Sequence, residues 1–255
     1  MKSSYNKIKD MDEKFKLPTE HVDLPSKGIL YSKENPLSSG KVEIKYMTAK
    51  EEDILTNQSY IKKGIVLDKL LQSLIIDKSI NYDDIIVGDK NALLVGARIL
   101  GYGAKYEFSY DGVKEEVDLS TLENSDFQEE LITKGKNEFD FKLPKTGANI
   151  TFKILDGRDE RAIDSELEGL KKINKEANPE MSTRLKYIIT SVEGNPDKKS
   201  IREFVDNYLL AQDSRALRNY IKLVQPDVDL TFFPEGSTEE ATIPVGLSFF
   251  WPDAG

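Results

Sequence analysis

Apolar residues between residues 48 and 103 recur at helical spacing. The clearest set falls at i, i+3, i+4, i+7 and i+8 and consists of Leu67, Leu70, Leu71, Leu74 and Ile75. A capping box made by Thr48 and Glu51 predicts the start of an earlier helix, which runs to about Gln58. Asp89 is a favourable N-cap for a third helix, which runs to Leu100 and stops at the glycines that follow.

The pattern changes to two-residue alternation after residue 103. Residues 106–110 alternate, Asp111-Gly112 is a strong signal for a two-residue turn, and residues 113–119 complete a hairpin. Residues 137–143 and 148–155 predict a second hairpin, with a turn that contains Pro and Gly between them. The whole stretch is therefore expected to be mostly antiparallel strand.

The N-terminal residues are more polar than the rest of the chain. Residues 1–23 contain five Lys and few apolar residues before Leu17, which predicts a flexible arm. The ordered part is expected to begin at Leu24. An initial hairpin is predicted to pair Ile29–Tyr31 with Val42–Met47 across a polar linker.

Helical spacing returns in the second half of the chain. Four apolar stripes predict four helices, which are lined by Ile163 to Ile173, Leu185 to Val192, Ile201 to Leu209 and Leu217 to Val224. Ser182 is expected to cap the second of these helices and Asp213 the fourth. The chain is then predicted to end in strands over residues 228–233 and 242–251.

These elements predict an α+β fold in which helical segments alternate with local antiparallel hairpins. The spacing shows no βαβ alternation, so a parallel doubly wound sheet is not expected. The predicted parts are a flexible arm over 1–23, a mostly helical part with an initial hairpin over 24–103, an antiparallel β part over 104–155, a helical part over 156–226 and a C-terminal β segment over 227–255.

Composition narrows the classes of function. The net charge of −9 disfavours binding to nucleic acid or to an anionic membrane, because both surfaces are negative. No apolar run approaches the roughly 20 residues of a membrane span. The chain has no Cys and a single His, His21, so disulfides, thiolate sites and multi-histidine metal sites are excluded. We therefore predict no metal and no cofactor.

No catalytic motif emerges from the sequence. His21 lies in the predicted arm, where a histidine is usually solvated and has no nucleophile to activate. Adjacent acids such as Asp83-Asp84 are typical of a solvated face and do not single out a pair for acid–base chemistry. The Gly101-Tyr102-Gly103 stretch follows a helix, where it predicts a helix stop and not a phosphate-binding loop. We predict that the chain is not an enzyme.

Two groups of residues are candidates for partner binding. Asp213, Arg215 and Arg218 lie near the start of the last predicted helix, where they suit an ion pair, either as an internal brace or at an interface. Phe249, Phe250 and Trp251 are consecutive, so a strand would point at least one ring away from the core. That ring is either packed within the fold or serves as an anchor on a partner.

Six segments stand out in order along the chain. They are Leu24–Tyr31 (LPSKGILY), Val42–Leu55 with its MTAKEED centre, Leu70–Asp77, Gly88–Gly103, Asp213–Ile221 (DSRALRNYI) and Phe249–Pro252 (FFWP). Together they resemble the baseplate hub subunits and related tail-assembly proteins of T-even-type, contractile-tailed bacteriophages. The resemblance implies a non-catalytic structural or assembly role at the centre of a tail baseplate.

The sequence departs from that family at one kind of site. Its members often carry CxxC knuckles in the hairpin after the glycine motif and in the penultimate β segment. Here these regions read Ser109-Tyr110-Asp111-Gly112 and Phe233-Pro234-Glu235-Gly236. The family's zinc is therefore not expected, and hydrogen bonds and packing must hold both turns.

The resemblance implies that the partners are other phage tail and baseplate proteins. The protein would reside in the host cytoplasm during assembly and then in the virion baseplate. An alternative is an assembly chaperone that binds tail proteins and is absent from the mature virion. A more distant alternative is a hydrolase whose site the sequence does not reveal.

Overall fold

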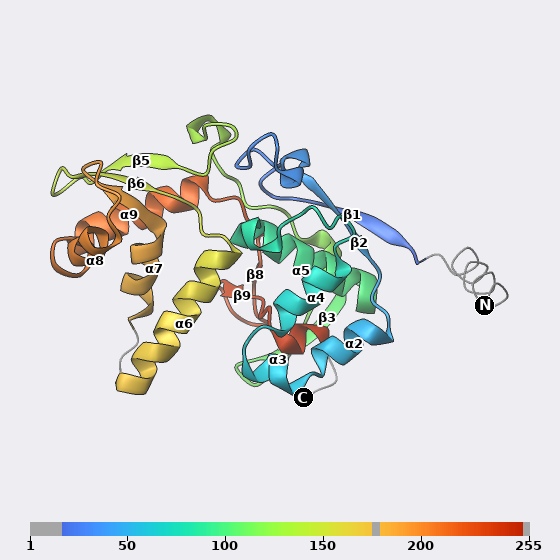
Figure 1. Cartoon of the computed structure of the whole chain (residues 1–255). Coiled ribbons are helices and arrows are strands. Elements are labelled where there is room, and N and C mark those ends of the chain that lie inside the picture. Colours follow the sequence, from blue (N-terminus) through green and yellow to red (C-terminus); the bar gives the residue numbers. More distant parts are fainter. Residues whose placement is uncertain (1–16, 175–178, 252–255) are drawn as a thin grey trace.

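The computed structural model describes residues 17–174 and 179–251 (Figure 1). Helices alternate along the chain with antiparallel sheets of two or three strands, so the fold is α+β as predicted. Residues 1–16 of the predicted arm and residues 252–255 of the predicted C-terminal segment lie outside the described residues.

The first sheet pairs β1 (Thr19–Asp23) with β2 (Lys41–Lys45). The predicted arm therefore extends too far, and the predicted first strand of this hairpin is wrong. The sequence signal for β1 is weak because Val22 is its one strongly apolar residue. Val22 packs against Gly96, where an added Cβ atom would lie 2.8 Å from Val22 Cγ2.

Residues 24–31 form successive turns in place of the predicted strand. Gly28 has a φ of 77°, a left-handed conformation that glycine adopts without strain. An added Cβ atom there would lie only 2.5 Å from the Ser38 carbonyl oxygen. The close approach of these two loops therefore requires glycine at this position.

The predicted helices follow, with one break. The capping box is confirmed, since the Thr48 amide donates to Glu51 Oε2 at 3.0 Å. The helix predicted to run to about Gln58 ends earlier, as α2 (Ala49–Leu55). A separate short helix that the sequence did not predict, α3 (Gln58–Lys62), begins after Asn57, its N-cap. The stripe of leucines forms the buried face of α4 (Val66–Leu74).

Glu51 links this helical part to β2 through a buried carboxylate. Lys45 Nζ and Ser73 Oγ donate to Glu51 Oε1 at 2.6 and 2.7 Å, while Thr48 donates to Oε2. Burial opposes ionisation, but these hydrogen bonds outweigh it and lower the pKa of Glu51 to about 2. The ionised carboxylate stabilises the fold above the unfolded-state pKa, roughly 4.3, and this stabilisation is lost as the pH falls towards 2.

We therefore expect Glu51→Gln to flatten the acid limb of the stability profile. Between about pH 5 and pH 2 the wild-type chain should lose on the order of 2–3 kcal/mol of unfolding free energy that the variant does not lose. Urea unfolding at a series of pH values measures this difference. Glu34→Gln, at an exposed position, is the matched control. Parallel pH profiles for wild type and Glu51→Gln would contradict the assignment.

Helix α5 (Val87–Tyr102) is the long central helix of the N-terminal part. It begins earlier than predicted, with Ile86 as N-cap, so Asp89 lies within the first turn and is not the cap. Gly88 lets the helix start lie against the backbone at Pro226, because an added Cβ atom would lie 1.9 Å from Pro226 O. The predicted stop is confirmed at Gly103, the C-cap, with a φ of 85°.

Both predicted central hairpins are present. β3 (Lys105–Tyr110) pairs with β4 (Val113–Asp118) across Asp111 and Gly112, which have φ values of 48° and 81°. These positive values are those of a two-residue hairpin turn that Asp-Gly favours. β5 (Phe139–Lys142) pairs with β6 (Asn149–Phe152).

A third strand joins the second hairpin. The sequence predicts a helix through Val192, but helix α7 (Glu180–Ile188) ends earlier and β7 (Ile189–Val192) pairs antiparallel with β6. Ile189, Thr190 and Val192 are β-branched, which favours strand over helix at this point. The start of α7 also differs from the prediction, because Pro179 and not Ser182 is the N-cap.

The remaining predicted helices are α6 (Gly157–Ile173), α8 (Lys198–Asn207) and α9 (Ala211–Val224). Their apolar stripes supply buried residues, among them Ile163, Ile201 and Leu217. Helix α9 starts after Leu210, so the prediction that Asp213 caps it is wrong.

The C-terminal strands are much shorter than predicted. β8 (Thr231–Phe232) pairs with β9 (Ala241–Thr242), and Leu247–Phe250 forms a 3-10 helix, η5. Pro244 and Gly246 interrupt the predicted second strand, since proline cannot donate to a sheet and glycine weakens one. The alternation assumed for the terminal aromatic residues therefore does not exist.

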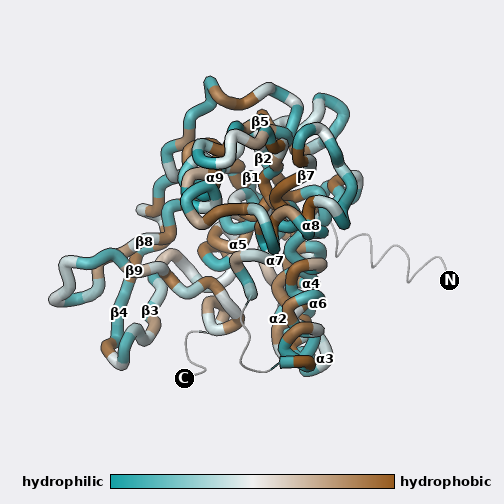
Figure 2. The backbone as a smooth tube through the Cα atoms, turned by 90° about the vertical axis from the view of Figure 1, so that its left-hand side faces the viewer, coloured by the Kyte–Doolittle hydropathy of each residue, from teal (hydrophilic) through white to brown (hydrophobic). Residues whose placement is uncertain are grey.

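Buried apolar side chains from all these parts form one cluster that runs from Leu24 to Phe250 along the sequence. The β3–β4 and β8–β9 hairpins project together from one side of this body (Figure 2). Their contact is aromatic, since the ring centroids of Phe108 and Phe232 lie 5.1 Å apart.

Candidate functional site

Asp89 is the centre of a buried hydrogen-bond network. Its carboxylate accepts from Ser26 N and Ser26 Oγ at 2.9 and 2.6 Å and from the Tyr31 hydroxyl at 2.6 Å. The Ile86 amide donates to the same tyrosine oxygen at 3.1 Å. Burial raises the pKa of Asp89, and the hydrogen bonds from Ser26 and Tyr31 act in the opposite direction. The network fixes the 24–31 turns to the start of α5.

Arg98 makes a second buried network at the other end of α5. Its guanidinium donates to Phe249 O at 2.8 Å, to Gly103 O at 2.7 Å and to Lys105 O at 3.1 Å. It also lies over the rings of Tyr102 and Tyr106, with its Cζ 5.4 and 5.7 Å from the ring centroids. Burial lowers the pKa of Arg98. Carbonyl oxygens and aromatic faces therefore take the place of a carboxylate partner.

The terminal aromatic residues are placed largely inside the fold. Phe249 and Phe250 are both 0 % exposed, and Trp251 is half-buried. Phe249 packs edge-to-face on Tyr106, with ring centroids 4.8 Å apart. The premise that a strand would expose one ring is wrong, because these residues belong to η5. Of the three, Trp251 alone keeps partial access to solvent.

Arg215 and Arg218 are on the solvent side of α9, and the structure separates them from Asp213. The buried Asp213 carboxylate accepts from the amides of Lys145 and Thr146 at 2.7 and 3.0 Å, in the turn between β5 and β6. Among residues 17–174 and 179–251, neither arginine forms an ion pair. The predicted internal ion pair is therefore wrong, since Asp213 accepts hydrogen bonds from a hairpin turn, and the interfacial role of the two arginines stays a prediction.

The two regions that carry CxxC knuckles in the resembling family lie side by side. Phe232 of β8 packs against Tyr110 at a centroid distance of 5.6 Å, as well as against Phe108. The Glu235 amide donates to Glu115 Oε1 at 3.0 Å across the two hairpins. No group of three or more potential metal-ligating side chains occurs in the described part of the chain. These turns do not fit a zinc ion, and aromatic packing with one hydrogen bond connects them.

We expect the protein to keep its stability when metal ions are removed. Incubation with a strong chelator should leave the thermal unfolding midpoint unchanged, because no thiolate or histidine cluster contributes metal-binding free energy to folding. Elemental analysis of the purified protein checks the same point. A stoichiometric zinc that survives dialysis would contradict it.

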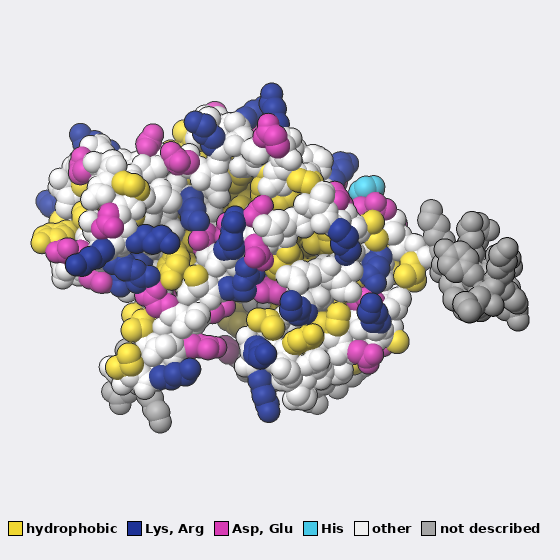
Figure 3. Space-filling model, viewed as in Figure 1, with side chains coloured by type: hydrophobic (Ala, Val, Ile, Leu, Met, Phe, Trp, Pro, Cys, Tyr) yellow, Lys and Arg dark blue, Asp and Glu magenta, His cyan; other side chains and the backbone are white. Residues whose placement is uncertain are grey.

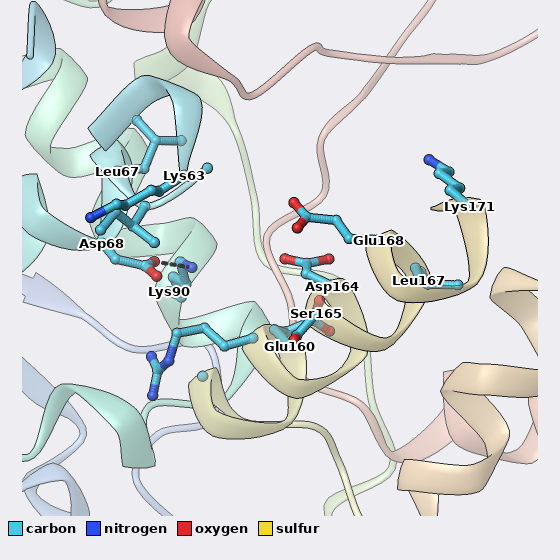
Figure 4. Close-up of a pocket in the computed structure, with 14 residues that line it drawn as sticks. Lys63, Leu67, Asp68, Lys90, Glu160, Asp164, Ser165, Leu167, Glu168 and Lys171 are labelled. Atoms are coloured by element: carbon cyan, nitrogen blue, oxygen red, sulfur yellow. Dashed lines mark hydrogen bonds and ion pairs between the residues drawn. The ribbon is translucent and has the colours of Figure 1, made fainter. Parts of the chain in front are cut away.

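A cleft lies between the α3–α4 turn and α6. It has a volume of about 490 Å³ and is visible on the face drawn in Figure 3. On one wall, Asp68 pairs with Lys90 at 2.6 Å and accepts from the Tyr82 hydroxyl at 2.7 Å. On the other wall, Asp164 and Glu168 of α6 point into the cleft (Figure 4).

The cleft is lined by charged side chains of both signs. Partial loss of solvent and then the neighbouring Glu160 carboxylate raise the pKa of Asp164, although this residue is largely exposed. The Ser165 hydroxyl also lines the cleft, and no hydrogen bond joins it to a base within the described residues. The hydrolase alternative stays a prediction.

Comparisons with known proteins identify no relative. No protein-family model matches the sequence, no curated protein matches it, and no solved structure matches the fold. None of the helices in residues 17–174 and 179–251 has the length and apolar character needed to cross a bilayer.

Arg98 and the partners of Asp89 are the site residues that sequence reasoning missed. A usable signal exists for Arg98, because it is the one cation in the apolar run from Ala92 to Leu100. A lone cation on a buried helix face must find acceptors inside the fold. The partners of Asp89 carry no comparable local signal, since Ser26 is 63 residues away in sequence.

Proposed function

We propose that this chain is a non-catalytic structural or assembly component of the baseplate hub of a contractile phage tail. The proposal rests on the resemblance of six segments to hub and tail-assembly proteins. Its partners would be other tail and baseplate proteins. Its place would be the host cytoplasm during assembly and then the virion baseplate.

One observation supports this function more than the others: the resembling segments bind one another. Residues of Leu24–Tyr31 hydrogen-bond to Asp89, and Arg98 hydrogen-bonds to Phe249, which is 151 residues away in sequence. The residues that carry the resemblance thus hold the framework together instead of lining one cleft. This arrangement suits a structural role, in which the overall fold is needed for assembly and no single cleft is.

The surface is compatible with binding to other proteins. Within residues 17–174 and 179–251, four large apolar side chains are more than half exposed, namely Ile173, Phe233, Tyr208 and Met181. Isolated exposed apolar residues are ordinary, but these lie on projecting hairpins and helix ends where partners have access. The same surface suits an assembly chaperone, which stays the second candidate.

Quantitative mass spectrometry of purified virions distinguishes the two candidates. A hub component should be present in a fixed ratio to other baseplate proteins after removal of free protein on a density gradient. A chaperone should be absent from virions but should co-purify with tail proteins from infected cells. Absence from virions together with absence of tail proteins from the pull-down would contradict the proposed function.

A further inference from the structure

The projecting hairpins enclose an acidic hollow. A cavity of about 260 Å³ lies between the β3–β4 turn and the loop that joins β8 to β9. Its lining includes five carboxylate residues and no cation: Asp111, Glu115, Glu235, Glu239 and Glu240. Among the described residues, none of the five forms an ion pair. This cavity, which we call the acidic hollow, is therefore concave and carries negative charge that no ion pair within the described residues neutralises.

An exposed aromatic residue immediately precedes Pro234, which lines the acidic hollow. Phe232 packs against Phe108 and Tyr110, whereas Phe233, the residue after β8, is 63 % exposed. Val113, in the lining, is also exposed. An exposed phenylalanine beside a charged concavity is typical of a surface that binds another protein. The partner must offer cations that fit the hollow and apolar groups that cover Phe233.

Helix α9 of the same chain offers such a surface. Arg215, Arg218 and Lys222 fall at i, i+3 and i+7 and are all exposed, which places them in one row on the helix. None of the three has an ion-pair partner within residues 17–174 and 179–251. Exposed Tyr208 and Leu210 lie just before the helix and supply apolar area. We call the three cations the basic ridge.

We propose that the acidic hollow binds the basic ridge of a second copy of this chain, so that copies associate head to tail. The hairpins project away from α9 (Figure 2), which leaves both surfaces open to other copies. A contact between two different surfaces is heterologous, so an open assembly keeps one free hollow at one end and one free ridge at the other until a ring closes. The charges of the two surfaces are opposite, which sets the orientation of the contact.

Charge exchange tests this contact in the full-length chain. The ridge variant carries Arg215→Glu and Arg218→Glu, and the hollow variant carries Glu239→Lys and Glu240→Lys. Analytical ultracentrifugation of wild type at low salt should show concentration-dependent association. Each variant alone should associate at least about a hundredfold more weakly, because like charges then face each other. The control variant carries Lys134→Glu and Lys136→Glu in an exposed turn. Its net charge changes by the same amount as that of the ridge variant, and it should associate as wild type does.

Mixing the two variants gives the decisive result. The native ridge of the hollow variant fits the native hollow of the ridge variant, and the exchanged hollow fits the exchanged ridge, so the mixture should regain association although each variant alone does not. A chain with all four exchanges should regain association. Circular dichroism and the unfolding midpoint confirm that each variant is folded. A monomeric wild type at the highest soluble concentration, or variants that associate like wild type, would overturn the proposal.

Discussion

Replacing Arg98 with methionine is expected to lower the free energy of unfolding by about 3–5 kcal/mol, because the buried guanidinium is the donor for three backbone carbonyls. Methionine fills a similar volume but leaves the oxygens of Phe249, Gly103 and Lys105 without that donor. The tie between α5 and the C-terminal η5 is lost at the same time. Urea unfolding followed by circular dichroism measures the change.

Two further variants serve as controls for Arg98→Met. Arg158→Met removes an arginine whose ion pair is exposed to solvent, so the loss there should stay below about 1 kcal/mol. Arg98→Lys keeps the charge but cannot reach three divergent carbonyls with a fixed fork, so its loss should be intermediate. An Arg98→Met variant as stable as Arg158→Met would show that the network adds nothing to folding.

Truncation of Phe249 to alanine should cost about 3–5 kcal/mol of unfolding free energy, the range for a buried phenylalanine. Its ring is 0 % exposed and packs edge-to-face on Tyr106 and Phe250. Phe250→Ala should cost a similar amount, because that ring is equally buried. Trp251→Ala should cost less, since its side chain is only half-buried.

This expectation replaces the one drawn from the sequence. If the last residues formed a strand, one of the variants Phe250→Ala and Trp251→Ala would mainly lower stability, and the other would mainly weaken assembly. In the 3-10 helix, Phe249 and Phe250 both face the core, so both variants should lose stability first. The comparison is made by thermal unfolding of the three single variants. A fully stable Phe250→Ala variant would contradict the packing of η5.

Local signals in the sequence predicted the elements whose cause is local. The Thr48–Glu51 capping box and the Asp111-Gly112 turn depend on neighbouring backbone groups, so they can be recognised without knowledge of the rest of the chain. The leucine stripe of α4 is equally local, because one helix face is set by spacing alone. These features, and the α+β class that follows from them, are confirmed.

The errors occur where a distant part of the chain decides the structure. β1 forms because β2 is available as its partner, and its own five residues contain little apolar pattern. Asp89 and Asp213 look like helix caps, yet each carboxylate accepts hydrogen bonds from a loop at least 58 residues away. β7 depends likewise on pairing with β6. Such pairings are tertiary contacts, and spacing within one segment does not encode them.

The candidate interaction surfaces also differ in how far the sequence alone predicts them. The sequence singles out Arg215 and Arg218, and the structure leaves both on the exposed side of α9. The acidic hollow brings together residues near 113 and near 237, which no single segment contains.

Deletion of the gene tests the proposed role in the tail most directly. Lysates of the deleted phage should contain filled heads without complete contractile tails under negative-stain electron microscopy, and infectivity should return when a plasmid supplies the intact chain. The framework variant Arg98→Met should restore it poorly at high temperature, whereas Arg158→Met should restore it fully. Normal tails and unchanged infectivity after deletion would contradict a role in baseplate assembly.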